Sequence, residues 1–359
     1  MAFLEFKNVR IAGISAGVPE FTASNIHPQD ADGFSHDYSP EAFVETTGVL
    51  ERRLSDKLTT SDLCFAAAER LIGDIGWDRS EIEAIVFVSQ TADYILPATA
   101  CILQDRLGLS RECYAEDVAL GCSGWVYGLS NVAGLLEAGS IRKALLLCGD
   151  AKKRAKGPRD PLFGHAGTAT AVEFEEGNEG FKFHFGTDGS GYDAIITPDG
   201  GSRNQVSPES FKLEEVDGKL LHRMQTRMKG MDVFSFGITT APKSVKRLAE
   251  HFGFDYQNYD YFVFHQANMK MNNLISKKLK LSSDKVPSSM YHFGNTSSAS
   301  IPLTIVTQLK DREGSPVKFI CCGFGVGLSW GTVAFTTDSR MVISDLVEIG
   351  DQEVQSDWV

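Results

Sequence analysis

Hydrophobic residues follow two spacings along the chain, one typical of helices and one typical of buried strands. In residues 61–76, leucine, alanine and isoleucine side chains recur at helical spacing. Residues 84–88 (AIVFV) then form the continuous apolar run of a strand covered on both faces. The two patterns also predict helices at 98–107, 123–138, 233–251, 268–279 and 301–309, and strands at 113–120, 144–148, 169–174, 261–264 and 317–322. Such alternation predicts an α/β fold with parallel sheets covered by helices.

Glycine and proline positions refine this outline. Gly139 is expected to cap the helix over 123–138, and Pro242 is expected to break or kink the helix over 233–251. The long uncharged stretch 319–335 carries four glycines and is too short to cross a membrane, so it predicts strand–turn–strand. The glycine-rich segment 186–207 is the predicted seam between two halves, and this division gives residues 1–185, 186–338 and an acidic tail, 339–359, of no predicted role.

Length and composition exclude several classes of protein. A chain of 359 residues suits two domains or one double-sized fold. Its 35 Lys and Arg against 47 Asp and Glu give a net charge of −12, so a general nucleic-acid binder is excluded, because phosphate binding needs a basic face. Seven cysteines without CxxC spacing indicate reduced thiols, and the eight histidines lack the spacing of a zinc site. With no signal peptide or membrane span predicted, we expect a metal-free cytoplasmic protein.

A candidate nucleophile lies where a predicted strand passes into a helix, in the segment LGCSGW. Cys122 stands at the helix N-terminus, where free backbone N–H groups and the helix dipole favour a thiolate and lower the pKa of the thiol. A thiolate in this place is suited to covalent catalysis. The alternative is a small buried cysteine in a tight turn.

Three further segments place polar residues at strand ends. His265, after the strand 261–264, could act as a general acid or base or donate to a developing anion, or it could be a structural histidine. Asn295 could donate its side-chain N–H to an oxyanion, or it could simply form a turn before the next helix. The glycines of residues 323–327 suit a turn that brings a backbone N–H close to a ligand.

The chain resembles the condensing enzymes of the thiolase fold. The resemblance lies in four segments that follow one another along the chain: GCSGW, HQAN, HFGNTSSAS and GFGVGLSWG. It is most similar to the β-ketoacyl-acyl-carrier-protein synthase III family. The segments TTGVLERR, LPATAC, LFGHAGTA and MKGMDVFSF extend the resemblance over about residues 10–336. The resemblance implies a thiolase-like fold, with duplicated βαβαβαββ halves in five layers, α-β-α-β-α, and a homodimer.

The resemblance also implies a reaction. Cys122 would be acylated by acyl-CoA or acyl-acyl carrier protein, and the backbone N–H groups of Cys122 and a residue near Gly327 would form its oxyanion hole. His265 and Asn295 would bind the thioester oxygen of malonyl-acyl carrier protein, where loss of CO2 creates an enolate that two aimed donors stabilise. The carbanion would attack acyl-Cys122 and give 3-oxoacyl-acyl carrier protein, with no permanently bound cofactor.

Basic residues in this acidic chain suit an acidic carrier protein as a partner. By the resemblance, Lys270, Lys277 and Lys278 fall on the docking helix, although two adjacent lysines also fit a solvated helix face. A second basic cluster follows the predicted strand 144–148 and could meet coenzyme A phosphates or the carrier, or be an ordinary surface loop. It comprises Lys152, Lys153, Arg154, Lys156 and Arg159.

Departures from the family pattern concern the acyl donor. Ala42 and Phe43 occupy the neighbourhood of a Trp that stacks on the coenzyme A adenine, and Thr46 stands where an Arg often contacts the cofactor. His165 replaces an Asp of the family motif. Leu96 replaces a Phe that limits the acyl pocket in some members, which leaves room for a longer or branched acyl group. The acyl chain, its carrier and the pathway, whether fatty-acid initiation or a specialised product, therefore stay open.

Three other functions compete with condensation. A related acyltransferase would pass the acyl group from Cys122 to an amine or hydroxyl, but the presence of His265 and Asn295 favours an enolate. A non-catalytic subunit that binds acyl carriers would not need Cys122. A nicotinamide oxidoreductase would rest on the glycines of residues 323–327 alone, which lack GxGxxG spacing.

Overall fold

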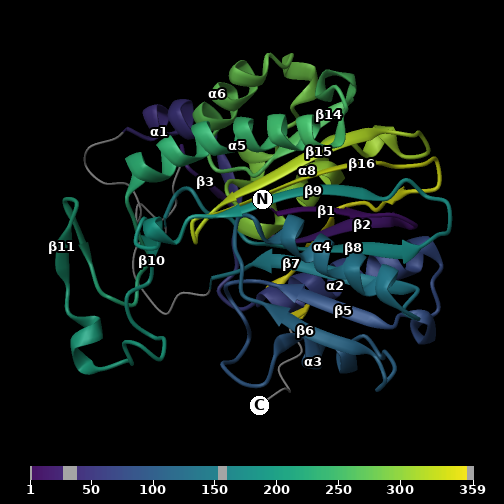
Figure 1. The fold of residues 1–359 in the computed structure, drawn as a ribbon. Helices are drawn as coiled ribbons and strands as arrows, with labels where there is room; N and C mark the ends of the chain where they lie inside the picture. Colours follow the sequence, from purple (N-terminus) through teal and green to yellow (C-terminus); the bar gives the residue numbers. More distant parts are fainter. Residues whose placement is uncertain (1, 27–38, 153–159, 354–359) are drawn as a thin grey trace.

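Two mixed β-sheets form the framework of the protein in the computed structural model, which describes residues 2–26, 39–152 and 160–353 (Figure 1). The first sheet contains, in spatial order, β17 (Val342–Ile343), β2 (Val9–Pro19), β8 (Ala166–Phe174), β7 (Lys143–Asp150), β5 (Ala84–Val88) and β6 (Tyr114–Val118), with β18 (Val347–Ile349) also paired to β2. The second contains β1 (Ala2–Phe6), β9 (Phe181–Thr187), β16 (Ser329–Thr336), β15 (Lys318–Gly325) and β14 (Tyr261–Phe264).

Eight α-helices occur in the described residues, and short 3-10 turns join many of the elements. The helices are α1 (Pro40–Thr47), α2 (Thr60–Ile75), α3 (Thr99–Arg106), α4 (Gly124–Ala138), α5 (Gly230–Phe252), α6 (Met269–Leu279), α7 (Met290–Phe293) and α8 (Ser300–Gln308). The 3-10 turns are η1 (Arg79–Glu81), η2 (Gly189–Gly191), η3 (Pro208–Phe211), η4 (Tyr256–Asn258), η5 (Ser283–Lys285), η6 (Ser297–Ala299), η7 (Lys310–Arg312) and η8 (Asp351–Glu353).

The helices lie in three layers around the two sheets. Helices α2 and α3 pack on the outer face of the first sheet, and α5 and α6 cover the outer face of the second (Figure 1). Helices α4 and α8 contact strands of both sheets and fill the middle layer, where the largest apolar core lies. The predicted α-β-α-β-α arrangement is therefore confirmed.

The local signals at the helix ends differ in detail from those that the sequence predicts. Thr59 caps α2, with Asp62 completing a capping box, because its side chain and the helix N–H groups satisfy each other. Gly139 ends α4, but with φ −164° and ψ −138° it is not in the left-handed conformation of a glycine cap. Pro242 lies inside α5, which continues on both sides of it, so the predicted break is wrong; the residue is buried among the contacts of α5 with the second sheet.

The expectation of parallel sheets is only partly right. Pairing is parallel between β5 and its neighbours β6 and β7, and between β14 and β15, but antiparallel between β2 and β8, β7 and β8, and β15 and β16. Three residues separate β15 from β16, and a connection this short cannot make the crossover that parallel pairing needs. The stretch 319–335 is thus the predicted strand–turn–strand.

Both ends of the chain cross between the two halves. Strand β1 pairs with β9 in the second sheet, while β17 and β18 pair with β2 in the first. The tail that had no predicted role thus supplies two short strands, and the proposed boundary at residues 185 and 186 falls inside β9. Residues 188–229, between β9 and α5, carry the strand pair β10–β13 (Ile195–Ile196, Arg227–Met228) and, between these strands in sequence, the hairpin β11–β12 (Glu214–Val216, Lys219–Leu221). This segment projects from the body (Figure 1).

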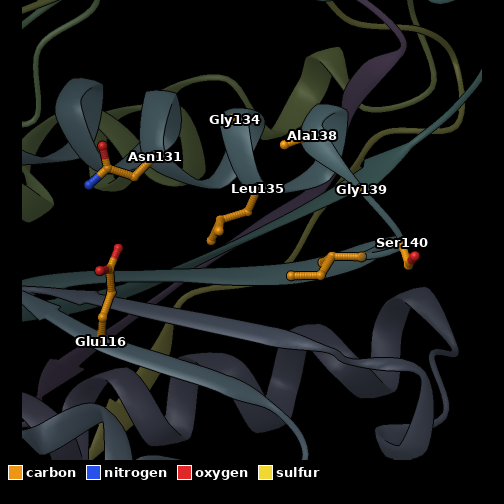
Figure 2. Close-up of a pocket in the computed structure, with 8 residues that line it drawn as sticks. Glu116, Asn131, Gly134, Leu135, Ala138, Gly139 and Ser140 are labelled. Carbon is orange, nitrogen blue, oxygen red and sulfur yellow. The ribbon is translucent and has the colours of Figure 1, made fainter.

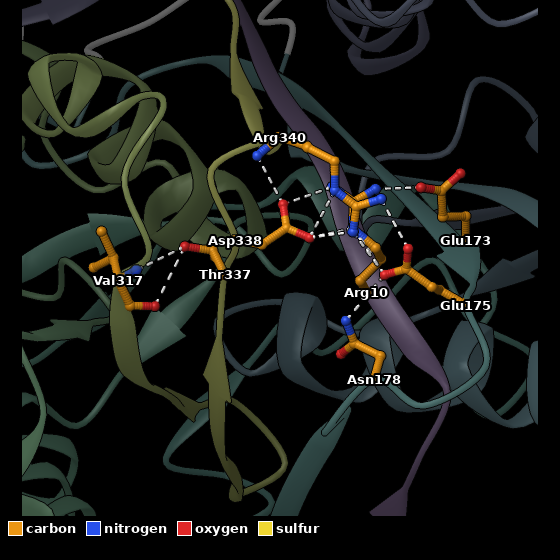
Figure 3. A network of polar contacts seen from close by, with 8 residues as sticks. All are labelled: Arg10, Glu173, Glu175, Asn178, Val317, Thr337, Asp338 and Arg340. Carbon is orange, nitrogen blue, oxygen red and sulfur yellow. Dashed lines mark hydrogen bonds and ion pairs between the residues drawn. The ribbon is translucent and has the colours of Figure 1, made fainter.

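A network of charged side chains fastens the two sheets together at one end (Figure 3). Arg10 of β2 is 6% exposed and pairs with Glu173 of β8. It also donates two hydrogen bonds, of 3.1 and 3.0 Å, to the carboxylate of Asp338, which follows β16 of the second sheet. Because the guanidinium is matched by carboxylates from both sheets, its burial does not leave an unpaired charge. We call Arg10, Glu173, Glu175, Asp338 and Arg340 the Arg10 network.

Candidate active site

Cys122 lies in the turn between β6 and α4, and β15 of the other half passes directly against it. A Cβ atom added to Gly325 would lie 2.5 Å from Cys122 Cβ and 2.8 Å from its Sγ. One added to Gly323 would lie 2.8 Å from the Cys122 carbonyl oxygen. Two glycines of the predicted glycine turn are therefore needed as strand residues, because any larger side chain would displace Cys122.

The thiol of Cys122 is a weaker acid than the sequence predicts. Burial raises its pKa to about 11, and the negative charge of Asp150 acts in the same direction. The backbone N–H groups of Val326 and Cys122 and the Ser297 hydroxyl oppose this rise. The predicted lowering of the pKa is thus wrong, because lost hydration outweighs the donors that face the sulfur. At neutral pH Cys122 is a thiol, and acyl transfer requires a proton acceptor.

His265 follows β14 and is 1% exposed. Its Nδ1 lies 2.8 Å from Ser300 Oγ, at the start of α8, and the ring of Phe324 meets it edge-on with 5.7 Å between centroids. Burial lowers the pKa of His265 to about 3, although a backbone hydrogen bond with Ser297 opposes the change. The imidazole is therefore neutral, and when Ser300 donates to Nδ1 the ring proton is carried by Nε2.

Asn295 is held by its backbone beside residues 162–164. Its N–H donates to the Leu162 carbonyl at 2.9 Å, and its own carbonyl accepts from the Gly164 N–H at 3.1 Å. Its side-chain Oδ1 accepts a 2.9 Å hydrogen bond from the Ser297 N–H. The turn-forming role is thus real, and because it uses the oxygen, the amide N–H2 stays available as a donor.

Ser297 is the residue that connects the three predicted catalytic residues. Its N–H binds Asn295, its backbone is hydrogen-bonded to His265, and its hydroxyl acts on the Cys122 thiol. It holds a left-handed conformation with φ 53°, which is costly for a residue with a Cβ atom and is typical of functional sites. The structure therefore brings Cys122, His265 and Asn295 around one strained serine.

The backbone donor next to the nucleophile belongs to Val326, one residue before Gly327. Together with the N–H of Cys122 itself, the Val326 N–H faces the sulfur. Gly327 has φ 136°, which only glycine adopts readily, and it turns the chain back from β15 into β16. The glycine thus shapes the turn that presents the Val326 N–H.

The other predicted site residues lie elsewhere on the chain. Leu96 is 83% exposed in the loop between β5 and α3, so within one chain it is not a buried wall of a pocket. Lys270, Lys277 and Lys278 are exposed on α6, and Lys278 donates to the Ile238 carbonyl of α5. In the second basic cluster, Lys152 binds the Thr226 hydroxyl, while residues 153–159 lie outside the described residues.

His165, which replaces the Asp of the family motif, accepts a backbone hydrogen bond. It is 8% exposed, and its Nδ1 accepts a 3.2 Å hydrogen bond from the Ser55 N–H. A carboxylate oxygen could accept the same bond. The substitution therefore preserves an acceptor for the backbone after β4 (Glu51–Arg53), which pairs with β3 (Thr22–Ser24).

Four residues of the site were missed from sequence: Asp150, Ser297, Phe324 and Val326. Ser297, Phe324 and Val326 lie within recognisable motifs, whereas Asp150 ends β7 outside them. Nothing in the spacing of any of the four separates it from its neighbours. Among the described residues, no group of three His, Cys, Asp or Glu is placed to hold a metal ion. No helix in the described ranges is long and apolar enough to cross a membrane.

Comparisons with known proteins agree with this geometry. Residues 116–189 match the model of 3-oxoacyl-[acyl-carrier-protein (ACP)] synthase III, and residues 249–337 match that of its C-terminal part. The β-ketoacyl-[acyl-carrier-protein] synthase III of Clostridium acetobutylicum is 32% identical over 333 residues, covering 91% of this chain and 98% of the relative. Both matched regions contain residues of the site, since Cys122 lies in the first and His265 and Asn295 lie in the second.

Solved structures extend the match to the whole fold. A 3-oxoacyl-(acyl-carrier protein) synthase from Burkholderia xenovorans LB400 superposes with a TM-score of 0.87 at 36% identity, covering 97% of this chain and 99% of that one. The priming β-ketosynthase of the R1128 polyketide pathway gives a TM-score of 0.76 at 22% identity, covering 95% of this chain and 99% of that one, and shares the fold alone.

Five layers built on two mixed sheets, together with the match to a solved synthase at 36% identity, define a condensing enzyme of the thiolase fold. Within that class, the chain belongs to the β-ketoacyl-acyl-carrier-protein synthase III family. It is therefore an acyltransferase of the 3-oxoacyl-acyl-carrier-protein synthase III type.

Proposed function

We propose that the protein condenses an acyl group, carried on Cys122, with malonyl-acyl carrier protein and releases CO2. The observation that carries this proposal is the common contact with Ser297, which joins the nucleophile to a neutral histidine and an amide donor. An acyltransferase that used an amine or hydroxyl acceptor would need the cysteine but would have no use for two donors aimed at one oxygen.

In the first stage, Cys122 Sγ attacks the thioester of acyl-CoA or acyl-acyl carrier protein. The N–H groups of Cys122 and Val326 would stabilise the tetrahedral oxyanion, because both already face the sulfur. The donor thiol leaves, and the acyl group stays on Cys122. A covalent intermediate of this kind requires ping-pong kinetics.

In the second stage, the malonyl thioester oxygen binds between His265 and Asn295. Loss of CO2 places negative charge on that oxygen, and the imidazole and amide N–H groups stabilise it. Because the pKa of His265 is about 3, the donor stays neutral through the physiological pH range and does not protonate the carbanion. The carbanion attacks the acyl carbon, the bond from that carbon to Cys122 Sγ breaks, and the 3-oxoacyl product forms. The Cys122 thiolate that leaves takes up a proton from water, which restores the thiol.

The proposed macromolecular partner is an acidic acyl carrier protein. Lys270, Lys277 and Lys278 are exposed on α6, and Lys243 and Lys246 are exposed on α5, which packs beside it. These side chains form a local basic surface in a chain of net charge −12. Such a surface would steer an acidic carrier toward the site, while the negative charge of the rest of the chain would repel acidic proteins from other surfaces.

We further propose a homodimer formed along β6. This strand is the free edge of the first sheet, and a hollow of about 550 Å³ lies between it and α4, lined in part by Glu116, Asn131 and Leu135 (Figure 2). In the loop before α3, Ile95 is 96% exposed and Leu96 is 83% exposed. Free edges and exposed apolar side chains are typical of surfaces that a second copy covers.

Sedimentation of wild type and Ile95→Asp tests the proposed homodimer. A monomeric wild type would contradict it.

The acyl-transfer proposal is tested by intact-mass measurement after incubation with panels of acyl-CoA and acyl-acyl carrier protein. Wild type should gain the mass of one acyl group, and Cys122→Ala should gain none. Cys101→Ala removes an exposed cysteine outside the site and is the matched control, which should label like wild type. Equal labelling of wild type and Cys122→Ala would contradict the proposal.

The role of His265 is tested separately by malonyl decarboxylation. His265→Ala should still be acylated, but its decarboxylation should fall by about a hundredfold or more, as expected for the loss of one oxyanion donor. If acylation collapses in this variant instead, His265 is the base for Cys122 and the assignment of the two stages is wrong.

A further inference from the structure

Asp150 is a buried carboxylate beside the nucleophile that the reaction above does not use. It is the last residue of β7, and one of its oxygens, Oδ1, is held by three donors. These are the N–H of Gln90 at 2.9 Å and the hydroxyls of Thr91 at 3.0 Å and Ser89 at 3.1 Å. The carboxylate is therefore fixed in one orientation, which leaves the second oxygen, Oδ2, pointing away from these donors.

Oδ2 of Asp150 is buried and makes no well-aligned hydrogen bond. The Ser297 hydroxyl approaches the carboxylate closely enough to stabilise its charge, and the same hydroxyl acts on the Cys122 thiol. A buried carboxylate oxygen without a full partner costs stability, so it is rarely kept without a function. Ser297 thus lies between an unsatisfied acceptor and a thiol that has a proton to lose.

Independent contacts place these three residues together. The turn η6, which begins at Ser297, packs against β7 and α4. The side chain of Gln90, whose N–H holds Asp150, lies against the turn of the nucleophile, since a Cβ atom on Gly121 would be 2.2 Å from Gln90 Oε1. On the other side, a Cβ atom on Gly124 would lie 3.3 Å from Ser298 Cβ. The arrangement is therefore built into the packing of the β7, α4 and η6 elements.

We propose that Asp150, acting through the Ser297 hydroxyl, accepts the proton of Cys122 during acyl transfer. This inference rests on the proposed acylation of Cys122. His265 is a poor alternative acceptor, because its Nδ1 is engaged with Ser300 and it is a very weak base. A carboxylate whose basicity is raised by burial is the better proton acceptor of the two.

The step balances without any further reactant. As the bond from Cys122 Sγ to the acyl carbon forms, the thiol proton passes to Ser297 Oγ and the Ser297 hydroxyl proton passes to Asp150 Oδ2. When the donor thiolate leaves, the proton returns along the same path to its sulfur. Asp150 is again ionised and Ser297 neutral, and one thiol has been exchanged for another with nothing oxidised or reduced.

Two readouts on Asp150→Asn separate a relay from a structural or purely electrostatic role. Removing the negative charge should lower the pKa of Cys122, so alkylation by iodoacetamide at pH 8 should become faster than in wild type. Removing the proton acceptor should make single-turnover acylation slower, by roughly tenfold to a hundredfold. Faster alkylation with slower acylation is the expected pair of results, because a merely distorted site would slow both reactions.

The pH dependence of acylation supplies a second test. Without the relay, the rate should follow the free thiolate and rise about tenfold per pH unit between pH 7 and 9. Among the described residues, the other ionisable groups around Asp150 include the thiols of Cys64 and Cys148, with Asp93 and Arg106 also acting on Cys64. None of these groups is substituted in Asp150→Asn. If the acylation rate of this variant rises more steeply with pH than that of wild type, the difference is therefore assigned to the loss of Asp150.

Ser297→Ala is the companion variant and should also slow acylation, while leaving the Asp150 charge in place. Ser298→Ala is the matched control, because its hydroxyl donates to the Val88 carbonyl instead, and it should acylate like wild type. Acylation by Asp150→Asn and Ser297→Ala at wild-type rate, in folded protein, would overturn the relay. No acylation of wild type by any donor would instead overturn the proposed function itself.

Discussion

The Arg10 network and the surroundings of Cys122 are two clusters of buried charge that the fold treats in opposite ways. In the Arg10 network, the guanidinium is matched by carboxylates from both sheets, and the hydrogen bonds from Arg340 and Arg10 overcome burial to lower the pKa of Asp338 to about 2 (Figure 3). Around Cys122, burial raises the pKa of both the Cys122 thiol and the Asp150 carboxyl, and the hydrogen bonds that oppose this rise at Asp150 come from neutral hydroxyl and N–H groups.

The difference shows how the same physical cost is used for two purposes. A charge that is fully paired fixes the relative position of two sheets, and its protonation state does not change near neutral pH. A charge that is incompletely paired is ready to take up a proton, at some cost in stability. The proposed condensing site lies in the second kind of cluster, and substitutions in the two should have different consequences.

The largest effect on stability is expected from Arg10→Ala. This change leaves the carboxylates of Glu173 and Asp338 without their shared cation, and breaking a buried ion pair costs about 3–5 kcal/mol. Urea unfolding at pH 7 measures the loss. Arg340→Ala is the control, because its side chain is 59% exposed, and it should cost no more than about 1 kcal/mol. Equal losses for the two would show that burial does not govern the network.

Next in size, Gly325→Ala tests how tightly the nucleophile is held. The added Cβ would lie 2.5 Å from Cys122 Cβ, so either strand β15 or the cysteine must move. A displacement of about 1 Å can lower a rate by about a hundredfold, and acyl labelling of Cys122 should fall by that amount. Gly201→Ala has no heavy atom within 4 Å of the added carbon and should label normally. Normal labelling of Gly325→Ala would mean that the site is more plastic than its packing indicates.

Replacing one carboxylate of each cluster by an amide should change stability in opposite directions at pH 7. Asp338→Asn loses charge-assisted hydrogen bonds from Arg10 and Arg340 and should cost about 1–2 kcal/mol. Asp150→Asn removes a charge that burial disfavours, so the free energy of unfolding should stay equal or rise. Thermal unfolding of both variants beside wild type checks the signs, and destabilisation by Asp150→Asn would show that its charge is compensated after all.

The sequence predicts which main residues lie around Cys122, but it predicts neither the hydrogen bonds there nor any part of the Arg10 network. Cys122 and His265 follow strands, as predicted, whereas Asn295 follows the short helix α7, so the predicted strand end is wrong there. All three lie within recognisable motifs, and the helices and strands around them follow from hydrophobic spacing. Ser297 lies in the same motif as Asn295, but its role depends on a left-handed backbone that no spacing reveals. The low acidity of Cys122 was also missed, because burial depends on β15, which comes about 200 residues later.

The Arg10 network was not predicted because its members are distant in sequence. Arg10 and Asp338 are 328 residues apart, and they meet only because β2 and the end of β16 approach each other at the junction of the sheets. The crossing of the terminal strands escaped prediction for the same reason, since β17 and β18 are too short to produce a hydrophobic pattern. Local pattern predicts elements, and long-range pairing decides which of them share a sheet.

The smallest effect is a pH dependence whose sign differs between the clusters. The folded pKa of Asp338, about 2, is below the ordinary value of 3.8, so its contribution to stability is full above pH 4 and is lost as the pH falls toward 2. Because the side chain is partly exposed, this contribution should be about 1 kcal/mol. The difference in unfolding free energy between wild type and Asp338→Asn should therefore shrink between pH 4 and pH 2.5.

Asp150 should behave in the reverse way, because its folded pKa is raised. The loss of stability caused by ionised, buried Asp150 is absent below the ordinary pKa of an aspartate and develops as the pH rises through the higher folded pKa. Wild type and Asp150→Asn should thus be equally stable near pH 3.5 and diverge toward neutral pH, with the variant the more stable. Parallel pH profiles for the two carboxylates would mean that the clusters differ only in composition, whereas opposed profiles would show that one is built to keep its charge and the other to exchange a proton.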